Sequence, residues 1–164
     1  MPAVKPNYVA IPAVAAGVAT FGSVLTRSGM DWYRTQVDCP DWTPSGRTIG
    51  AVWTMLFAMG AASALMVWNR MPRDRRFREV IGLFAANAVL NNTWSWLFFR
   101  RHRMGLATVE SGALGLVTLL LVVRLWPWNR VSSALLMPYV GWVAFATYLT
   151  HNIWRMNEER SAVL

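Results

Sequence analysis

A short polar stretch, LNNTWSWLFF at residues 90–99, interrupts an otherwise apolar run with two amides, two hydroxyls and two indoles. Asn91 and Trp94 stand three apart and therefore share one face of a helix, with Asn87 on that face one turn earlier. Asn92 is rotated by about 100° and points elsewhere. The amides either hold the polar edge of a ligand or bond to a neighbouring helix, which is worth about 0.6 kcal/mol on average inside a membrane. Spacing alone leaves both interpretations open.

A single acidic side chain, Glu110, lies inside another long apolar stretch. A carboxyl group within a membrane is costly and usually faces the interior of a helix bundle or a wet cavity. Glu110 therefore either lines a ligand cavity or forms a structural hydrogen bond to an amide of the 79–99 segment. The sequence does not choose between these two roles.

Tryptophan is the most unusual feature of the composition, with ten in 164 residues. Six lie near span ends or in loops, as an aromatic belt at the membrane surface predicts: Trp32, Trp42, Trp68, Trp126, Trp128 and Trp154. Four lie deeper: Trp53, Trp94, Trp96 and Trp142. An indole has a wide apolar face and one N–H donor. If the deeper four face inward, they suit a flat, hydrophobic, partly polar ligand such as a sterol or a tetrapyrrole; the alternative is that they face lipid.

These side chains belong to segments that are long enough to cross a membrane. The chain is 55% hydrophobic and 15% charged, with a mean hydropathy of +0.30. Its charges collect between five apolar stretches: 8–25, 48–68, 79–99, 105–126 and 132–156. Each has about 18–25 residues, enough for a helix across the hydrocarbon core, and lipid leaves backbone groups no partner outside a helix or barrel. We expect an all-α polytopic membrane protein, a five-transmembrane-helix bundle forming a single domain over residues 1–164.

The segment 26–47 is too long to be a simple connector between the first two stretches. It carries aromatic residues and prolines, and its three arginines are balanced by three aspartates. Long loops of this kind often act as lids or binding loops. We expect this segment to cover a binding site, and we call it the lid.

The remaining connections are basic, and the whole chain has a net charge of +8. Arginines at span ends favour anionic lipid headgroups and argue against nucleic acid as a partner. Lysine and arginine divide equally, eight on each side of the expected membrane, so the charge rule leaves the orientation open. Small residues spaced four apart, in the 105–126 and 8–25 stretches, favour close helix packing or an oligomer seam.

Three blocks of the sequence together carry a resemblance to a known family. DWY…CPDWTPS…VWTMLF, LNNTWSWLFFRRHRMGLATVE and MPYVGWVAFATYLTHNIWRMN resemble the translocator protein family, also called tryptophan-rich sensory proteins or peripheral benzodiazepine receptors. The match covers essentially the whole chain, in order and at matching spacings. It implies a five-helix bundle, commonly a homodimer, with a pocket closed by the lid. It also implies ligands such as porphyrins and other tetrapyrroles, cholesterol, and synthetic benzodiazepines or isoquinolines.

Carried over by position, the resemblance implies a set of ligand-binding residues. They are Trp42, Pro44, Trp53, Phe57, Asn91, Trp94, Glu110, Trp142 and Ala146. Trp53 and Trp142 match the pocket tryptophans implicated in the light-dependent porphyrin breakdown reported for some bacterial members. No metal site and no required cofactor is expected, because the two histidines stand alone and a porphyrin would be a ligand.

Three functional hypotheses follow. The leading one is a tetrapyrrole-binding membrane protein that acts in sensing, transport or regulation. The second is light-driven porphyrin oxidation through Trp53 and Trp142, although the chain has no phosphate loop, nucleophile elbow or carboxylate pair that would indicate an ordinary enzyme. The third is an accessory subunit of a larger membrane complex, motivated by departures from the family pattern at Ser45, Phe57 and Thr150. Fifteen arginines against one lysine favour a bacterial gene.

Overall fold

The structure is a computed structural model that describes residues 6–163, with side chains as far as residue 160. Within these residues the chain is helical and contains no strand. The helices are α1 (Asn7–Ser28), α2 (Met30–Gln36), α3 (Gly46–Arg70), α4 (Arg75–Ser95), a π-helical turn η1 (Trp96–Arg100), α5 (Met104–Leu125), α6 (Arg130–Ala134) and α7 (Met137–Val163).

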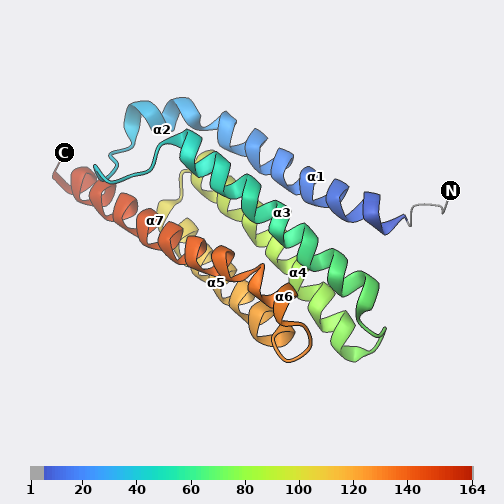
Figure 1. Cartoon of the computed structure of the whole chain (residues 1–164). Coiled ribbons are helices and arrows are strands. Elements are labelled where there is room, and N and C mark those ends of the chain that lie inside the picture. Colours follow the sequence, from blue (N-terminus) through green and yellow to red (C-terminus); the bar gives the residue numbers. More distant parts are fainter. Residues whose placement is uncertain (1–5, 164) are drawn as a thin grey trace.

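The long helices α1, α3, α4, α5 and α7 lie side by side in one bundle (Figure 1). α5 packs most extensively against α7 and α4, while α1 packs against α3 and α4. The end of the bundle with α2 and the C-terminal part of α7 is called the lid end. The opposite end holds the α3–α4 and α5–α6 turns and is called the basic end.

Four helical segments are long and apolar enough to cross a membrane: α1, α3, α5 and Arg130–Arg160, which contains α6 and most of α7. The expectation of an all-α membrane protein is therefore confirmed. α4 has the length of a span, but its hydropathy is low. The reason is that its first turns carry Arg75, Arg76, Arg78 and Glu79, and its later turns carry several amides and hydroxyls.

The bounds of the helices depart from the hydropathy pattern at three places. The lid contains a short helix, α2, which the hydropathy pattern does not indicate because its residues are mostly aromatic, polar or charged. α4 begins before the apolar stretch because Asp74 caps it, its side chain accepting the backbone N–H of Phe77 at 2.9 Å. The last stretch is divided at residues 135–136, just before Pro138 in the first turn of α7, where a missing N–H is tolerated.

Two local features hold the lid in place. Ser45, which departs from the family pattern, is the N-cap of α3, and its Oγ accepts the Thr48 backbone N–H at 3.1 Å. Gly29, between α1 and α2, lies against the backbone of Phe99, so closely that a Cβ there would collide with the Phe99 carbonyl group. A glycine is needed for α2 to fold back onto η1.

The structure also distinguishes the two small-residue stripes. On α5, Ala107 and Ser111 are buried, and a Cβ added to Gly115 would lie 3.4 Å from Val143 Cγ1, so this stripe faces α7. On α1, Ala13 is exposed and a Cβ on Gly17 would meet nothing within 4 Å. The α5 stripe is therefore packing inside the bundle, and the α1 stripe faces outward.

Candidate functional site

A buried hydrogen-bond network links α4, α5 and α7 in the middle of the bundle. Asn87 Nδ2 donates to Thr118 Oγ1 at 2.8 Å, and the Tyr139 hydroxyl donates to Asn87 Oδ1 at 3.1 Å. Asn91 Nδ2 donates to the same Tyr139 oxygen at 3.0 Å. All four side chains are buried. We call these residues the Tyr139 network; they confirm that Asn87 and Asn91 share a face and show that both bond to neighbouring helices.

A second group of polar atoms on the same three helices has no partner. The indole Nε1 of Trp94 on α4, both carboxyl oxygens of Glu110 on α5 and the indole Nε1 of Trp142 on α7 are buried and make no hydrogen bond within the described residues. We call these three residues the unpaired set. An unsatisfied buried polar group costs about 1–3 kcal/mol, so three together need an explanation.

The unpaired state of Glu110 decides one question that the sequence left open. No hydrogen bond joins Glu110 to an α4 amide: both of its carboxyl oxygens lack a partner, while the nitrogens of Asn87 and Asn91 donate to Thr118 and Tyr139. Two donors, from the indoles, and one acceptor group, from the carboxyl, are thus left for something else. A ligand with both donors and acceptors would satisfy them.

Aromatic rings pack around Tyr139 and Trp142. The ring centroid of Trp53 on α3 lies 5.7 Å from that of Phe57. It also lies 5.7 Å from that of Tyr139, which it meets edge-on. Trp142 lies 5.2 Å from Phe145. Trp53 and Trp142 pack against the same buried cluster, formed by Leu56, Leu114, Tyr139 and Val143. The structure therefore brings the two predicted pocket tryptophans to one region of the core.

Trp94 belongs to the neighbouring aromatic cluster towards the lid. It stacks on Phe98 with centroids 5.2 Å apart and meets Phe99 edge-on at 5.9 Å. Phe145 packs against this cluster and also touches Trp142, so the two clusters adjoin. The π-helical turn η1 carries Phe98 and Phe99, and π turns inside helices often occur at functional sites.

The lid lies against α7 through both rings and polar groups. Trp42 stacks on Tyr148 at 5.6 Å and meets Phe145 edge-on at 6.0 Å. Asp38 exchanges two hydrogen bonds with the Asn157 side chain, at 3.0 and 2.9 Å, and forms a 2.9 Å ion pair with Arg160. These contacts connect the lid to the same helix that carries Trp142.

Inside the lid, Tyr33 and Cys39 form a local contact. The Cys39 thiol donates to the Tyr33 hydroxyl oxygen at 3.2 Å. Burial raises the pKa of the Tyr33 hydroxyl above its ordinary value, and the hydrogen bond with Cys39 raises it further. Tyr33 therefore stays protonated, and it packs edge-on against Phe99 rather than supplying a charge to the site.

The remaining predicted residues are placed less centrally. Phe57 contacts Trp53, and Ala146 is half-buried on α7 one turn after Trp142. Pro44 is half-buried in the lid two residues after Trp42. None of the nine predicted residues lines either of the two surface cavities described below.

Sequence reasoning missed part of this site. Tyr139, Phe145 and Tyr148 were not proposed, although Tyr139, Trp142, Phe145 and Tyr148 recur at every third position. Each ring therefore neighbours the next, and the row turns around α7 from the buried Tyr139 to the exposed Tyr148. That spacing was the signal that would have found them. Thr118 gave no comparable signal, because a single threonine in a span usually bonds to its own helix.

Asn92 on α4 and Trp96, the first residue of η1, lie on the side that faces α1. They line an apolar surface groove of about 450 Å³ between α4 and α1, with Val18, Phe21, Leu25, Ala88, Val89 and Thr93. Asn92 Nδ2 donates to the Ala88 carbonyl oxygen at 3.1 Å, and its Oδ1 is buried without a partner. The expectation that Asn92 points away from Asn91 is confirmed.

Comparison with known proteins points to one family of membrane proteins. The model of the TspO/MBR family matches residues 9–155. The tryptophan-rich protein TspO of Bacillus cereus is 33% identical over 156 residues, which cover 93% of this chain and 98% of that protein. The translocator protein of Sus scrofa is 30% identical over 161 residues, covering 98% of this chain and 92% of that protein. The translocator protein of Homo sapiens is 31% identical over 137 residues, covering 79% of this chain and 76% of that protein.

Proposed function

This chain belongs to the TspO/MBR family of membrane proteins, and from that premise we propose that it binds a tetrapyrrole, in sensing, transport or regulation. The observation that carries the proposal is the unpaired set. Trp94, Glu110 and Trp142 present buried polar atoms from three helices, and residues 6–160 supply none of these atoms with a partner. Burying such groups is unfavourable unless a ligand completes their hydrogen bonds.

The chemistry of a tetrapyrrole matches what this region offers. Its flat, apolar macrocycle suits indole and phenyl faces such as those of Trp53, Trp142 and Phe145. Among its acidic side chains, a protonated carboxyl group is a donor for Glu110, and carboxyl oxygens are acceptors for indole N–H groups. A ligand of this class would therefore satisfy the donors and the acceptor together.

We further propose that α4 is a fifth membrane span. It lies among α1, α3 and α5 and packs along them. Its polar side chains Asn87, Asn91 and Ser95 are buried, whereas Val89 is exposed. In a membrane, polar groups turned toward other helices are compatible with a span that hydropathy alone does not identify.

We also propose a homodimer in a bacterial membrane. The outward-facing Ala13 and Gly17 on α1 would let a second copy approach closely. The bacterial source is supported by the preference for arginine over lysine and by the similarity to the Bacillus cereus protein.

A titration tests the ligand proposal. Purified protein in detergent is titrated with protoporphyrin in the dark, and binding is followed by the porphyrin absorbance, which does not depend on the number of tryptophans. We expect saturable binding that weakens in a Trp53→Phe, Trp142→Phe double variant. The matched control is Trp68→Phe with Trp126→Phe, which removes two exposed indoles near the basic end and should leave the affinity unchanged. Non-saturable binding, or equal affinity in both double variants, would refute the proposal.

A further inference from the structure

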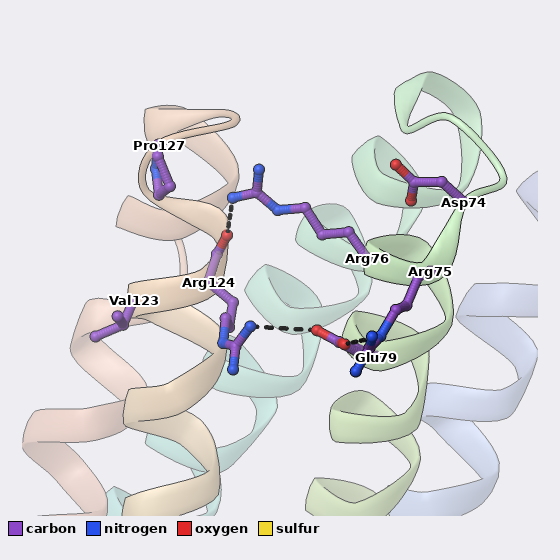
Figure 2. Close-up of a pocket in the computed structure, with 7 residues that line it drawn as sticks. All are labelled: Asp74, Arg75, Arg76, Glu79, Val123, Arg124 and Pro127. Carbon is purple, nitrogen blue, oxygen red and sulfur yellow. Dashed lines mark hydrogen bonds and ion pairs between the residues drawn. The ribbon is translucent and has the colours of Figure 1, made fainter.

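An open cavity of about 470 Å³ lies at the basic end, between the first turns of α4 and the last turns of α5 (Figure 2). It is lined by Asp74, Arg75, Arg76, Glu79, Val123, Arg124 and Pro127. None of these residues belongs to the tetrapyrrole site proposed above. The cavity combines three guanidinium groups with an apolar wall.

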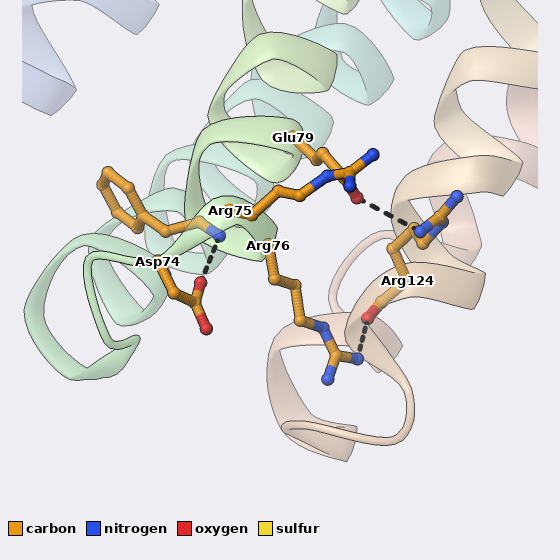
Figure 3. Close-up of polar contacts among 6 residues, drawn as sticks. Asp74, Arg75, Arg76, Glu79 and Arg124 are labelled. Carbon is orange, nitrogen blue, oxygen red and sulfur yellow. Dashed lines mark hydrogen bonds and ion pairs between the residues drawn. The ribbon is translucent and has the colours of Figure 1, made fainter.

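The two carboxylates at the cavity already have partners (Figure 3). Glu79 accepts from Arg75 Nε at 3.1 Å through one oxygen and from Arg124 Nη1 at 3.2 Å through the other. Asp74 caps α4 by accepting the backbone N–H of Phe77. Both Glu79 ion pairs are exposed to solvent, and exposed pairs are weak enough to rearrange around an incoming anion.

Arg76 differs from the other two arginines because it has no carboxylate partner. Its Nη2 donates to the backbone carbonyl oxygen of Arg124 at 2.6 Å, and it makes no ion pair within the described residues. The side chain is half-buried and extends across the cavity from α4 to α5. A positioned guanidinium group with free N–H donors is well suited to bind phosphate oxygens in pairs.

The wall on the α5 side is apolar and continues along the helix. Val123 is 57% exposed, and Leu116, Leu119 and Leu120 are exposed on the preceding turns of the same helix. α5 is one of the segments that can cross a membrane. The charged cavity is therefore continuous with a surface suited to acyl chains, which a free phosphate ion would not need.

We propose that this cavity binds the headgroup phosphate of an anionic phospholipid. Arg76 provides the fixed contact, Arg75 and Arg124 turn toward the phosphate, and the acyl chains lie along Val123 and the leucines of α5. Basic pockets between membrane helices select anionic headgroups in this way. The site would fix the position of the bundle relative to the membrane surface at this end.

Native mass spectrometry of the full-length protein in detergent tests this site. The protein is titrated with phosphatidylglycerol, with phosphatidylcholine and, as a competitor, with inorganic phosphate. We expect phosphatidylglycerol to bind more tightly than phosphatidylcholine, and Arg76→Gln to weaken the phosphatidylglycerol affinity about fivefold. Arg76→Lys keeps the charge and should recover part of the affinity, which separates loss of the site from loss of the fold.

The matched control is Arg78→Gln, which removes an exposed arginine two residues away that does not line the cavity. Its effect should stay below about twofold at physiological salt, because solvent and ions screen a charge outside the cavity. Equal losses in Arg76→Gln and Arg78→Gln would overturn the proposal in favour of diffuse charge attraction. Displacement of the lipid by millimolar phosphate would overturn it in favour of a free-phosphate site.

Discussion

The Tyr139 network and the unpaired set lie on the same three helices, but their polar atoms are in opposite states. In the network, Asn87, Asn91 and Thr118 converge on or beside Tyr139, and each is buried with a hydrogen bond. In the unpaired set, the indole nitrogens and the carboxyl oxygens are buried and find no hydrogen bond in the described part of the chain. A fully hydrogen-bonded network joins helices. Buried polar groups without hydrogen bonds instead lower the stability of the fold, and a ligand that bonds to them can offset that loss. The two groups should therefore separate stability from binding when they are mutated.

Tyr139→Phe should give the largest effect, and it should be on stability. The ring that contacts Trp53 remains, but the amides of Asn87 and Asn91 both lose the hydroxyl. We expect the free energy of unfolding to fall by about 2 kcal/mol, measured by denaturation in mixed detergent micelles. Protoporphyrin affinity should be retained in the folded protein; a stability equal to that of the original chain would remove the distinction between the two groups.

Glu110→Met should weaken ligand binding without lowering stability. The substitution keeps a side chain of similar length but removes the only acceptor of the unpaired set. Protoporphyrin affinity should fall about tenfold, the equivalent of one lost hydrogen bond of about 1.4 kcal/mol. Stability without ligand should not fall, because no hydrogen bond within the described residues is broken. If Glu110→Met instead unfolds the bundle with affinity intact, the carboxyl group is structural.

Trp142→Phe should show a smaller loss of binding. The phenyl ring preserves most of the aromatic contact with Phe145 and removes the unpaired indole N–H. We expect affinity to fall about fivefold, since one neutral hydrogen bond to the ligand is lost. Comparison with Trp96→Phe, in the surface groove beside α1, provides the control; similar losses in both variants would show that the effect is not specific to the interior.

Arg160→Gln should have the smallest effect, on the rate of ligand release. It removes the exposed ion pair that joins the lid at Asp38 to α7. Such pairs contribute little, so we expect protoporphyrin to dissociate only about twofold faster in stopped-flow measurements. Arg155→Gln removes an ion pair within α7 alone and should leave the rate unchanged. A faster release in Arg155→Gln as well would mean that the lid contact is not responsible.

The sequence predicted the elements of the fold better than their ends. The apolar stretches indicated where the long helices lie, but α4 starts within charged residues because Asp74 caps it, and this local hydrogen bond has no hydropathy signal. The break before α7 depends on Pro138, whose effect on a helix is visible in sequence. The lid helix α2 is stabilised by packing against η1, which requires the close approach at Gly29 and cannot be derived from composition.

The candidate site was predicted in part. The shared face of Asn87 and Asn91 follows from helical spacing, and the structure confirms it. Whether Glu110 is bonded depends on what the neighbouring helices offer, and the competing acceptors, Thr118 and Tyr139, become neighbours of the α4 amides only through tertiary packing. Sequence spacing therefore identifies candidate polar groups, but it does not show which of them are already paired.

The most direct test is the infrared difference spectrum between the protein with and without protoporphyrin. If the unpaired set binds the ligand, the Glu110 carboxyl gains a hydrogen-bond partner and its stretching band shifts. The difference spectrum should then contain a Glu110 band that is missing in Glu110→Met and retained in Tyr139→Phe, while the carboxyl groups of the porphyrin contribute to all three spectra. Identical difference spectra from the original chain and Glu110→Met would contradict the assignment of the unpaired set as the ligand site.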